Sequence, residues 1–227
     1  MTPAVPEILP IFRFCKSERW FPISVEESLP LFNLEYSAGK MRSNGIALSD
    51  RGRLNFPRDM KQPDLPPVVY HRVVTGGGLA WHQYWLWYLY NPWGIGGVGK
   101  HEGDWEFVQI GRTPGERARP ILMTCSQHHT GGKREFWSVE LKDERPLVYV
   151  ALGSHANYFG TGLQSGGIDL CDGEGLELAD YELRNFGEWA SWPGRWGNSD
   201  GEGKSPESPG CQTLRWKQPH IYHSNSK

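Results

Sequence analysis

The segment KHEGDWEFVQI, residues 100–110, carries two carboxylates at a spacing that suits metal or acid–base chemistry. On a strand, alternation places Asp104 and Glu106 on one face, followed there by apolar residues, and Trp105 on the other face. Burying neighbouring negative charges is costly unless a positive group compensates them. The pattern therefore predicts a metal ion, an Arg or a protonated His between the carboxylates, and a hard divalent cation is the simplest candidate.

A solvated strand end is the alternative interpretation, in which both carboxylates face water. The preceding run NPWGIGGVGKHEG, residues 91–103, favours a ligand site because glycines let a backbone approach a ligand closely. The same run also suits a flexible hairpin. The sequence thus indicates a site around residues 101–106 and leaves the solvated alternative open.

Histidines supply two further signals. SQHHTGG, residues 126–132, places His128 and His129 at the end of an apolar strand, where only one of two neighbours can share a face with the carboxylates. LVYVALGSHANYFGTG, residues 147–162, runs from an apolar strand into a turn that presents His155 as a ligand or general base. A lone histidine is more often structural. Three such segments beside core strands favour one shared site.

Strands are the elements that must position these residues. β-branched and aromatic runs separated by Gly-rich or charged turns predict strands over residues 8–14, 68–75, 83–90, 105–111, 120–126, 136–141 and 147–152. Ser24 to Glu27 matches a capping box and predicts a short helix to about Phe32. We therefore predict an all-β fold, an antiparallel β-sandwich with long Gly- and Pro-rich loops and one or two short helices. Gln83–Tyr90 is bulky on both faces, which predicts an interior strand.

Length and charge limit the function classes. The 227 residues suit one domain over residues 1–227. Lys and Arg total 24 against 26 Asp and Glu, so the net charge of −2 argues against a nucleic-acid partner. The N-terminus shows no signal peptide, and no apolar run is long enough for a membrane span, which predicts a cytoplasmic protein with peripheral membrane contact left open. The oligomeric state stays open.

Other features carry weaker signals. Four cysteines without C-x-x-C spacing predict reduced thiols, and a bridge between Cys171 and Cys211 stays open because both lie in loop sequence. The absence of a G-x-S-x-G elbow argues against a serine hydrolase. Tryptophans in residues 189–196 could stack on sugars or lipids, but neighbouring Pro and Gly favour a role in closing the core.

The order of several motifs resembles the vacuolar protein sorting-associated protein 62 family. The motifs are SERWFPISVEE, QYWLWYLYN, HEGDWEFVQI, QHHTGG and VYVALGSHANYF, with WPGRWG and RWKQPHIYH after them. The resemblance covers about residues 8–223. It implies a fold and a site more strongly than it implies a reaction.

The D-W-E step preceded by a His also resembles the motif of the necrosis- and ethylene-inducing cytolysins. That resemblance implies a β-sandwich with a divalent cation near the motif and recognition of glycosylated membrane lipids. It makes Asp104 and Glu106 ligands, directly or through water, with His101 beside them and Asn91 as a further polar ligand. The cytolysin motif carries a second His before the Asp, whereas this chain has Gly103 there, which argues against cytolysis.

The leading hypothesis is a divalent-metal-dependent hydrolase of a phosphate ester or phosphodiester, such as a lipid head group. Asp104 and Glu106 would bind the ion, and His155 or His128 would be the general base while the other histidine orients water or the leaving group. The alternative is a non-catalytic module that uses the same cation to bind a sugar or lipid head group. Ca²⁺ or Mg²⁺ is the expected ion, with Zn²⁺ or Mn²⁺ as alternatives.

Overall fold

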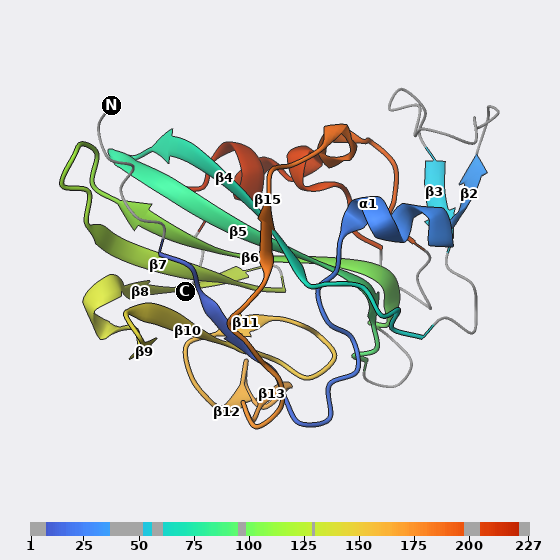
Figure 1. The fold of residues 1–227 in the computed structure, drawn as a ribbon, viewed down its shortest axis with the longest axis horizontal. Coiled ribbons are helices and arrows are strands. Elements are labelled where there is room, and N and C mark those ends of the chain that lie inside the picture. Colours follow the sequence, from blue (N-terminus) through green and yellow to red (C-terminus); the bar gives the residue numbers. More distant parts are fainter. Residues whose placement is uncertain are drawn as a thin grey trace.

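The computed structural model describes residues 8–36, 52–55, 61–94, 99–128, 130–197 and 205–222. Two β-sheets form the body of the molecule (Figure 1). The larger sheet has the strand order β15-β4-β5-β6-β7-β8 and contains β4 (Val68–Gly76), β5 (Leu79–Asn91), β6 (His101–Arg112), β7 (Pro120–Gln127), β8 (Thr130–Glu135) and β15 (Glu182–Arg184). The smaller sheet has the order β11-β10-β1-β14, with β9 added to β10. It contains β1 (Ile11–Arg13), β9 (Leu141–Lys142), β10 (Arg145–Val150), β11 (Asn157–Tyr158) and β14 (Glu177–Leu178).

Short ribbons and helices complete the fold. Two ribbons pair β2 (Asn33–Tyr36) with β3 (Gly52–Asn55) and β12 (Gly162–Gln164) with β13 (Asp169–Cys171). The helical elements are α1 (Val25–Ser28), η1 (Leu29–Leu31), η2 (Phe136–Ser138), η3 (Glu188–Ser191), η4 (Pro209–Cys211) and the π-helix η5 (Thr213–Lys217). The N-cap half of the predicted capping box is confirmed, because the Ser24 side chain accepts a hydrogen bond from the Glu27 amide. The Glu27 side chain pairs with Arg184 instead of completing the box. In the described ranges, no helix is long and apolar enough to cross a membrane.

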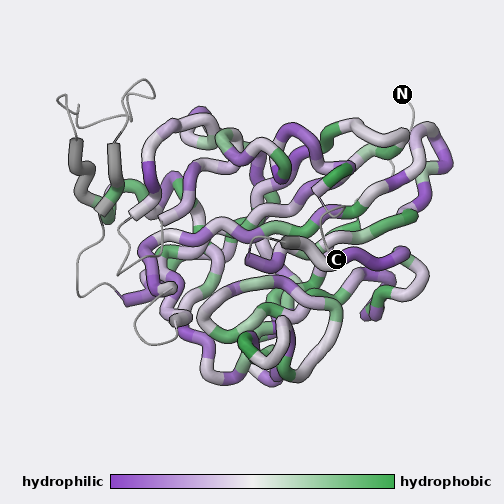
Figure 2. Tube along the Cα trace, turned by 180° about the vertical axis from the view of Figure 1, so that it is seen from behind, coloured by the Kyte–Doolittle hydropathy of each residue, from purple (hydrophilic) through white to green (hydrophobic). Residues whose placement is uncertain are grey.

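The predicted β-sandwich is confirmed, and β5 is an interior strand between β4 and β6. Its side chains alternate between two hydrophobic clusters. Tyr84 and Leu86 belong to the cluster between the two sheets, and Trp85 and Trp87 belong to the cluster on the outer face of the larger sheet. All four are fully buried, which explains why the sequence of this strand is apolar on both faces. Figure 2 shows that hydrophobic and hydrophilic residues alternate at short intervals along the described parts of the chain, as expected for strands that pack one face on a core.

The sheets are mixed rather than wholly antiparallel. β1 runs parallel to β10, and β15 runs parallel to β4. Long stretches of chain, rather than hairpins, connect the strands of each parallel pair. Alternation of side chains reports which face a residue occupies but not the direction of the neighbouring strand, so the antiparallel part of the prediction was wrong for these two pairs.

One predicted strand is misplaced. The segment 136–141 begins with the 3-10 helix η2, whereas the strand that pairs with β7 is the preceding segment, β8. β8 contains Gly131 and Gly132, which have low strand propensity, and its ladder with β7 overrides that local preference. Cys171 and Cys211 are both free thiols, so the bridge that the sequence left open is not formed.

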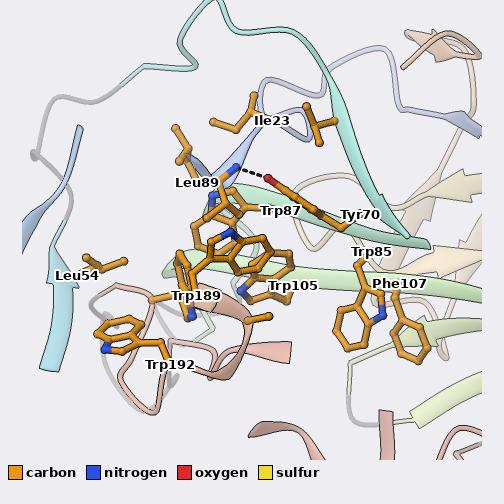
Figure 3. Packing of buried hydrophobic residues seen from close by; sticks show 14 of the residues in the cluster. Ile23, Leu54, Tyr70, Trp85, Trp87, Leu89, Trp105, Phe107, Trp189 and Trp192 are labelled. Carbon is orange, nitrogen blue, oxygen red and sulfur yellow. Dashed lines mark hydrogen bonds between the residues drawn. The ribbon is translucent and has the colours of Figure 1, made fainter. Parts of the chain in front are cut away.

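The Trp-rich segment closes the core on the outer face of the larger sheet, as predicted. Trp189 and Trp196 are buried there against Trp105 of β6, and Trp192 packs on Trp196. Figure 3 shows Trp105, Trp189 and Trp192 in this cluster. Trp105 stacks on Trp189 with ring centroids 5.4 Å apart and an interplanar angle of 13°. The same cluster fixes the first helix, because the Val25 amide donates to the Tyr70 hydroxyl at 2.8 Å. These tryptophans are therefore core residues and not an exposed stacking surface.

Candidate functional site

A cavity of about 640 Å³ lies where β6 separates from β7. The ladder between these strands begins only at Val108, opposite Cys125, so the first part of β6 pairs with β5 alone. The C-terminal segment, including η5, closes the open side. The cavity walls include Asn91, His101, Asp104, Glu106, His128 and Arg215. Six residues that come from four separate parts of the chain thus meet at one place.

The two carboxylates of the motif face this cavity from the same face of β6. Asp104 lies opposite Tyr88 and Glu106 lies opposite Leu86, both of them residues of the cluster between the sheets. Asp104 and Glu106 are only 6% and 5% exposed. Alternation along β6 therefore holds as predicted, and the solvated alternative is wrong.

Asp104 is paired with a buried histidine. His155 Nδ1 donates to Asp104 Oδ2 at 3.0 Å, and its Nε2 lies 3.7 Å from Glu18 Oε1. The ring is 0% exposed and stacks on Tyr88 at 3.9 Å with an interplanar angle of 2°. Burial by itself lowers the pKa of His155, but the two carboxylates raise it to about 9. His155 is thus an imidazolium at neutral pH, enclosed between two negative charges.

This geometry limits what His155 can do. Its side chain is not part of the cavity wall, and each ring nitrogen faces a carboxylate. A general base needs a free lone pair within reach of the ligand, and His155 offers none in this arrangement. The geometry fits a residue that fixes the orientation of Asp104. His155 also supplies one of the positive charges that the sequence required beside the carboxylates.

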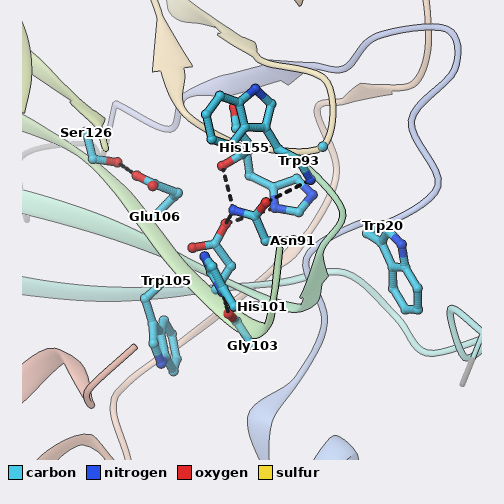
Figure 4. Close-up of polar contacts among 12 residues, drawn as sticks. Trp20, Asn91, Trp93, His101, Gly103, Trp105, Glu106, Ser126 and His155 are labelled. Atoms are coloured by element: carbon cyan, nitrogen blue, oxygen red, sulfur yellow. Dashed lines mark hydrogen bonds and ion pairs between the residues drawn. The ribbon is translucent and has the colours of Figure 1, made fainter. Parts of the chain in front are cut away.

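Glu106 has a different set of neighbours. Ser126 Oγ donates to Glu106 Oε2 (Figure 4). Burial raises the pKa of Glu106 to about 7, against the opposing effect of the Arg215 charge. The Arg215 guanidinium donates to the carbonyl oxygens of Trp105 and His128, which joins β6 to the end of β7 across the gap. Arg215 is therefore a second positive charge at the carboxylates, and charge burial alone does not require a metal ion.

Asn91 and His101 form the remaining part of the predicted cluster. They lie opposite each other at the ends of β5 and β6. Asn91 Nδ2 donates to Asp104 Oδ2 at 3.2 Å. His101 Nδ1 lies 2.7 Å from the carbonyl oxygen of Gly103 (Figure 4). Because a carbonyl oxygen only accepts, Nδ1 carries the proton, which leaves Nε2 of a neutral His101 able to act as a ligand.

Of the two neighbouring histidines, His128 lines the cavity, and His129 lies outside the described residues. His128 Nε2 donates to Asp169 Oδ2 at 2.7 Å. Asp169 belongs to β13 and is fully buried. The structure thus brings Asn91, His101, Asp104, Glu106 and His128 to one cavity and holds His155 behind it.

Sequence reasoning missed three charged residues of the site, namely Glu18, Asp169 and Arg215. Glu18 is part of the SERWFP motif, and that motif was the one signal available for it. Asp169 lies in Gly- and Ser-rich sequence that shows no periodicity, and Arg215 begins the RWKQPHIYH motif, which was likewise its one signal. Their role follows from contacts with residues far away in sequence, such as the bond from Arg215 to Trp105.

The fit of a divalent cation depends on the oxygens that other contacts leave free. Within the described ranges, Asp104 Oδ1 and Glu106 Oε1 have no hydrogen-bonding partner. No three His, Cys, Asp or Glu side chains of the described residues lie close enough together to enclose an ion. Two carboxylates supplemented by water suit Mg²⁺ or Ca²⁺, whereas a closed zinc site needs three or four protein ligands. The donor set therefore fits a hydrated hard cation and does not fit a zinc cage.

Gly103 occupies the position at which the cytolysin motif has its second histidine. Its φ is +67°, and a Cβ there would overlap the carbonyl oxygen of Trp196. The backbone of the WPGRWG segment thus packs against this position. A histidine at residue 103 is incompatible with this packing, so the departure from the motif follows from the C-terminal segment of this chain.

Comparison with known proteins agrees with both resemblances. No protein-family model matches the chain. Vacuolar protein sorting-associated protein 62 of Saccharomyces cerevisiae is 25% identical over 197 residues, which cover 66% of this chain and 41% of that protein. The chain therefore spans less than half the length of this curated relative.

Two solved structures have a similar fold. Necrosis and Ethylene inducing Protein 2, from the causal agent of cocoa's witches' broom disease, has a TM-score of 0.53 and 13% identity, over 93% of this chain and 87% of that chain. NLPPya in complex with mannosamine has a TM-score of 0.51 and 12% identity, over 95% of this chain and 86% of that chain. At such low identity, the likeness establishes a shared fold.

Proposed function

We propose that this protein is a cation-dependent binding module for a sugar or a glycosylated lipid head group. The observation that carries the proposal is the cavity at the open end of β6, in which Asp104 and Glu106 each keep one carboxylate oxygen free of protein partners. Small-ligand sites are concave and combine aromatic surface with a few fixed polar groups. The cavity has this character, since Trp93 lines it beside the carboxylates.

In this proposal Asp104 and Glu106 hold Mg²⁺ or Ca²⁺, with His101 beside them. The cation supplies a positive charge to which hydroxyl or phosphate oxygens of the ligand can bind. Asn91 and His155 fix the Asp104 carboxylate, and Ser126 fixes the Glu106 carboxylate. A similarly folded protein, NLPPya, has been solved with mannosamine, which makes an amino sugar the first ligand to test.

Binding is better supported than hydrolysis of a phosphate ester. Hydrolysis requires a general base next to the ligand. Of the two histidines predicted as general base, His155 is enclosed as an imidazolium between Asp104 and Glu18, away from the cavity wall. His128 does line the cavity, and the binding function uses it as a hydrogen-bonding group. The binding function uses Asp104 and Glu106 as they stand and needs no proton transfer from His155.

Calorimetric titration with mannosamine tests the proposal, in Mg²⁺, in Ca²⁺ and after treatment with EDTA. We expect binding that needs the cation, and a loss of at least about tenfold in Asp104→Asn and in Glu106→Gln, since each removes a charged ligand. Glu116→Gln, in the exposed turn at the other end of β6, makes the same charge change and should bind as the wild type does.

Two outcomes contradict the proposal. Binding that is unchanged after EDTA contradicts the role of the cation, and failure of the wild type to bind mannosamine contradicts the sugar-binding function. Asp104→Asn also breaks the pair with His155, so its folded fraction is measured by circular dichroism. Glu106→Gln keeps a hydrogen-bond acceptor for Ser126 and serves as the second variant if Asp104→Asn does not fold.

A further inference from the structure

We propose that His128, oriented by Asp169, is the residue of the cavity that makes a hydrogen bond to a hydroxyl group of the bound sugar, through its Nδ1 atom. The inference rests on the proposed sugar-binding function and adds a contact on a different wall of the cavity. Asp104, Glu106 and the cation would hold one part of the ligand. His128 and Trp93 would contact another part and select for the position of a hydroxyl.

Asp169 fixes which nitrogen of His128 is available. The distance from His128 Nε2 to Asp169 Oδ2 is 2.7 Å. An ionised carboxylate only accepts hydrogen bonds, so the Nε2 atom carries a proton and Nδ1 is left for another partner. Across the described part of the chain, Nδ1 of His128 has no hydrogen-bonding partner. This arrangement is the one in which a carboxylate sets the tautomer of a functional histidine.

Asp169 is itself held rigidly. The Ser154 hydroxyl donates to its Oδ1 at 2.8 Å, and the Tyr158 hydroxyl donates to its Oδ2 at 2.5 Å. The Asp169 side chain is 0% exposed, whereas that of His128 is 32% exposed. Three hydrogen bonds to a buried carboxylate keep it ionised and in place, and its pKa is lowered despite burial. Asp169 is therefore a positioning residue that does not itself reach the ligand.

The backbone of His128 is fixed as well. Its φ is +49°, in the left-handed region that residues other than glycine adopt rarely. Arg215 donates to its carbonyl oxygen, and Asp169 holds its ring, so both ends of the residue are restrained. Strained backbone conformations persist where surrounding contacts determine them, and they are frequent at ligand sites.

Trp93 provides the apolar half of a sugar site. Its ring lies 5.3 Å from the ring of His128 at an angle of 49°, and both residues line the cavity. Trp93 is held by its backbone amide, which donates to Asn91 Oδ1 at 3.0 Å, and by its indole, which donates to the carbonyl of Ile168 at 3.3 Å. An aromatic surface beside an oriented polar atom suits a pyranose, which has C–H faces and hydroxyl edges.

Protonation of His128 does not abolish such a contact. The bond to Asp169 raises the pKa of His128, and burial partly opposes this effect. A neutral Nδ1 accepts a hydrogen bond from a hydroxyl, and a protonated Nδ1 donates one to the same hydroxyl oxygen. A hydroxyl group is thus a suitable partner in both states, whereas an ammonium group can bind only the neutral form.

The decisive test is a cycle between His128→Asn and the monodeoxy analogues of mannosamine, measured by calorimetric titration with Mg²⁺ or Ca²⁺. Asn tolerates a positive φ but is too short to replace the imidazole, so the backbone of the variant is matched to the wild type. We expect the wild type to lose about tenfold in affinity for one analogue, the usual scale for one hydrogen bond. His128→Asn should lose about tenfold for mannosamine and show no further loss for that analogue.

Asp169→Asn provides a second, spectroscopic readout. An NMR titration should show a lower pKa for His128 in this variant, because the carboxylate that stabilises the imidazolium is gone. The affinity for mannosamine should fall, and the double variant with His128→Asn should bind no more weakly than His128→Asn alone. An unchanged His128 pKa would show that Asp169 does not position the ring.

The outcomes separate the inference from the proposed function. Failure of the wild type to bind mannosamine overturns both. Cation-dependent binding by the wild type, together with equal binding by His128→Asn, overturns the contact of His128 alone. The contact of His128 is also overturned if His128→Asn lowers the affinity for every deoxy analogue by the same factor as for mannosamine. The effect of the substitution would then not depend on one hydroxyl. Glu116→Gln is the matched surface control, and urea unfolding of each variant reports on its stability.

Discussion

Two histidine–carboxylate pairs flank the site, and they differ in whether a ring nitrogen of the histidine is left without a protein partner. His155 has Asp104 on one nitrogen and Glu18 near the other, and its ring is fully buried against Tyr88. His128 has Asp169 on one nitrogen, and about a third of its side chain is exposed in the cavity. The same two residue types thus form an enclosed ion cluster in one place and an accessible polar group in the other.

The difference shows that enclosure, rather than residue type, decides the role of each pair. A buried imidazolium between two carboxylates has its charge and its donors satisfied, so its removal leaves negative charge uncompensated in the core. A partly exposed imidazole with one free nitrogen retains the capacity to bind a ligand. The comparison therefore predicts large stability effects for the first pair and large ligand effects for the second.

The largest expected effect is on stability in His155→Gln. Removing one member of a buried ion cluster costs about 3–5 kcal/mol, because the partner charges stay buried. We expect the free energy of unfolding, measured in urea by circular dichroism, to fall by this amount. His128→Asn is the matched variant and should fall by less than about 1 kcal/mol. Equal losses in the two variants would remove the distinction between the pairs.

The pH dependence of stability should follow the enclosed pair. The pKa of His155 is about 9 in the folded protein against 6.5 for an ordinary histidine, so the unfolded chain releases this proton first. The stabilisation is complete below pH 6.5 and is lost as the pH rises towards 9, in total on the order of 3 kcal/mol. Urea unfolding at several pH values checks this, and the decline over this range should be absent in His155→Gln.

A smaller effect on stability is expected at low pH, and it comes from Glu18, the carboxylate on the other side of His155. Burial tends to raise the pKa of Glu18, but His155 and the backbone amides of Gly153 and Trp20 lower it to about 2, compared with 4.5 for an ordinary glutamate. Its contribution to stability is therefore complete above pH 4.5 and is lost as the pH falls towards 2. Glu18→Gln should show a smaller decline in this range than the wild type, and an identical decline would contradict the assignment.

The smallest stability effect is expected for the accessible pair, although its ligand effect is large. His128→Asn should unfold within about 1 kcal/mol of the wild type, since His128 is partly exposed and Asp169 keeps its bonds from Ser154 and Tyr158. A loss of about tenfold in mannosamine affinity alongside this small change would sharpen the comparison. A large loss of stability with unchanged affinity would reverse it.

Local patterns in the sequence predicted several parts of this molecule. Alternation correctly placed Asp104 and Glu106 on one face of a strand and made Gln83–Tyr90 an interior strand. The Ser24–Glu27 capping box predicted α1, and the Pro- and Gly-flanked tryptophans were correctly assigned to the core. Each of these features depends on neighbours within a few residues along the chain, which is why it is visible in the sequence.

The strand direction and the state of each histidine could not be predicted in this way. β1 pairs in parallel with β10, which follows it by more than a hundred residues, and nothing local encodes that pairing. His155 and His128 both follow apolar strands, so their sequence contexts are alike. Glu18 and Tyr88 enclose the first, and Asp169 orients the second, through contacts between distant segments.

The sequence by itself therefore identified several residues that meet at the cavity, and it determined which face of β6 presents Asp104 and Glu106. The tertiary structure decided that Arg215 and His155 compensate the carboxylates, that His155 is sealed and that His128 is open. The physical reason is that alternation is set by the backbone of one strand, whereas burial, charge compensation and access depend on which distant segments pack around a side chain.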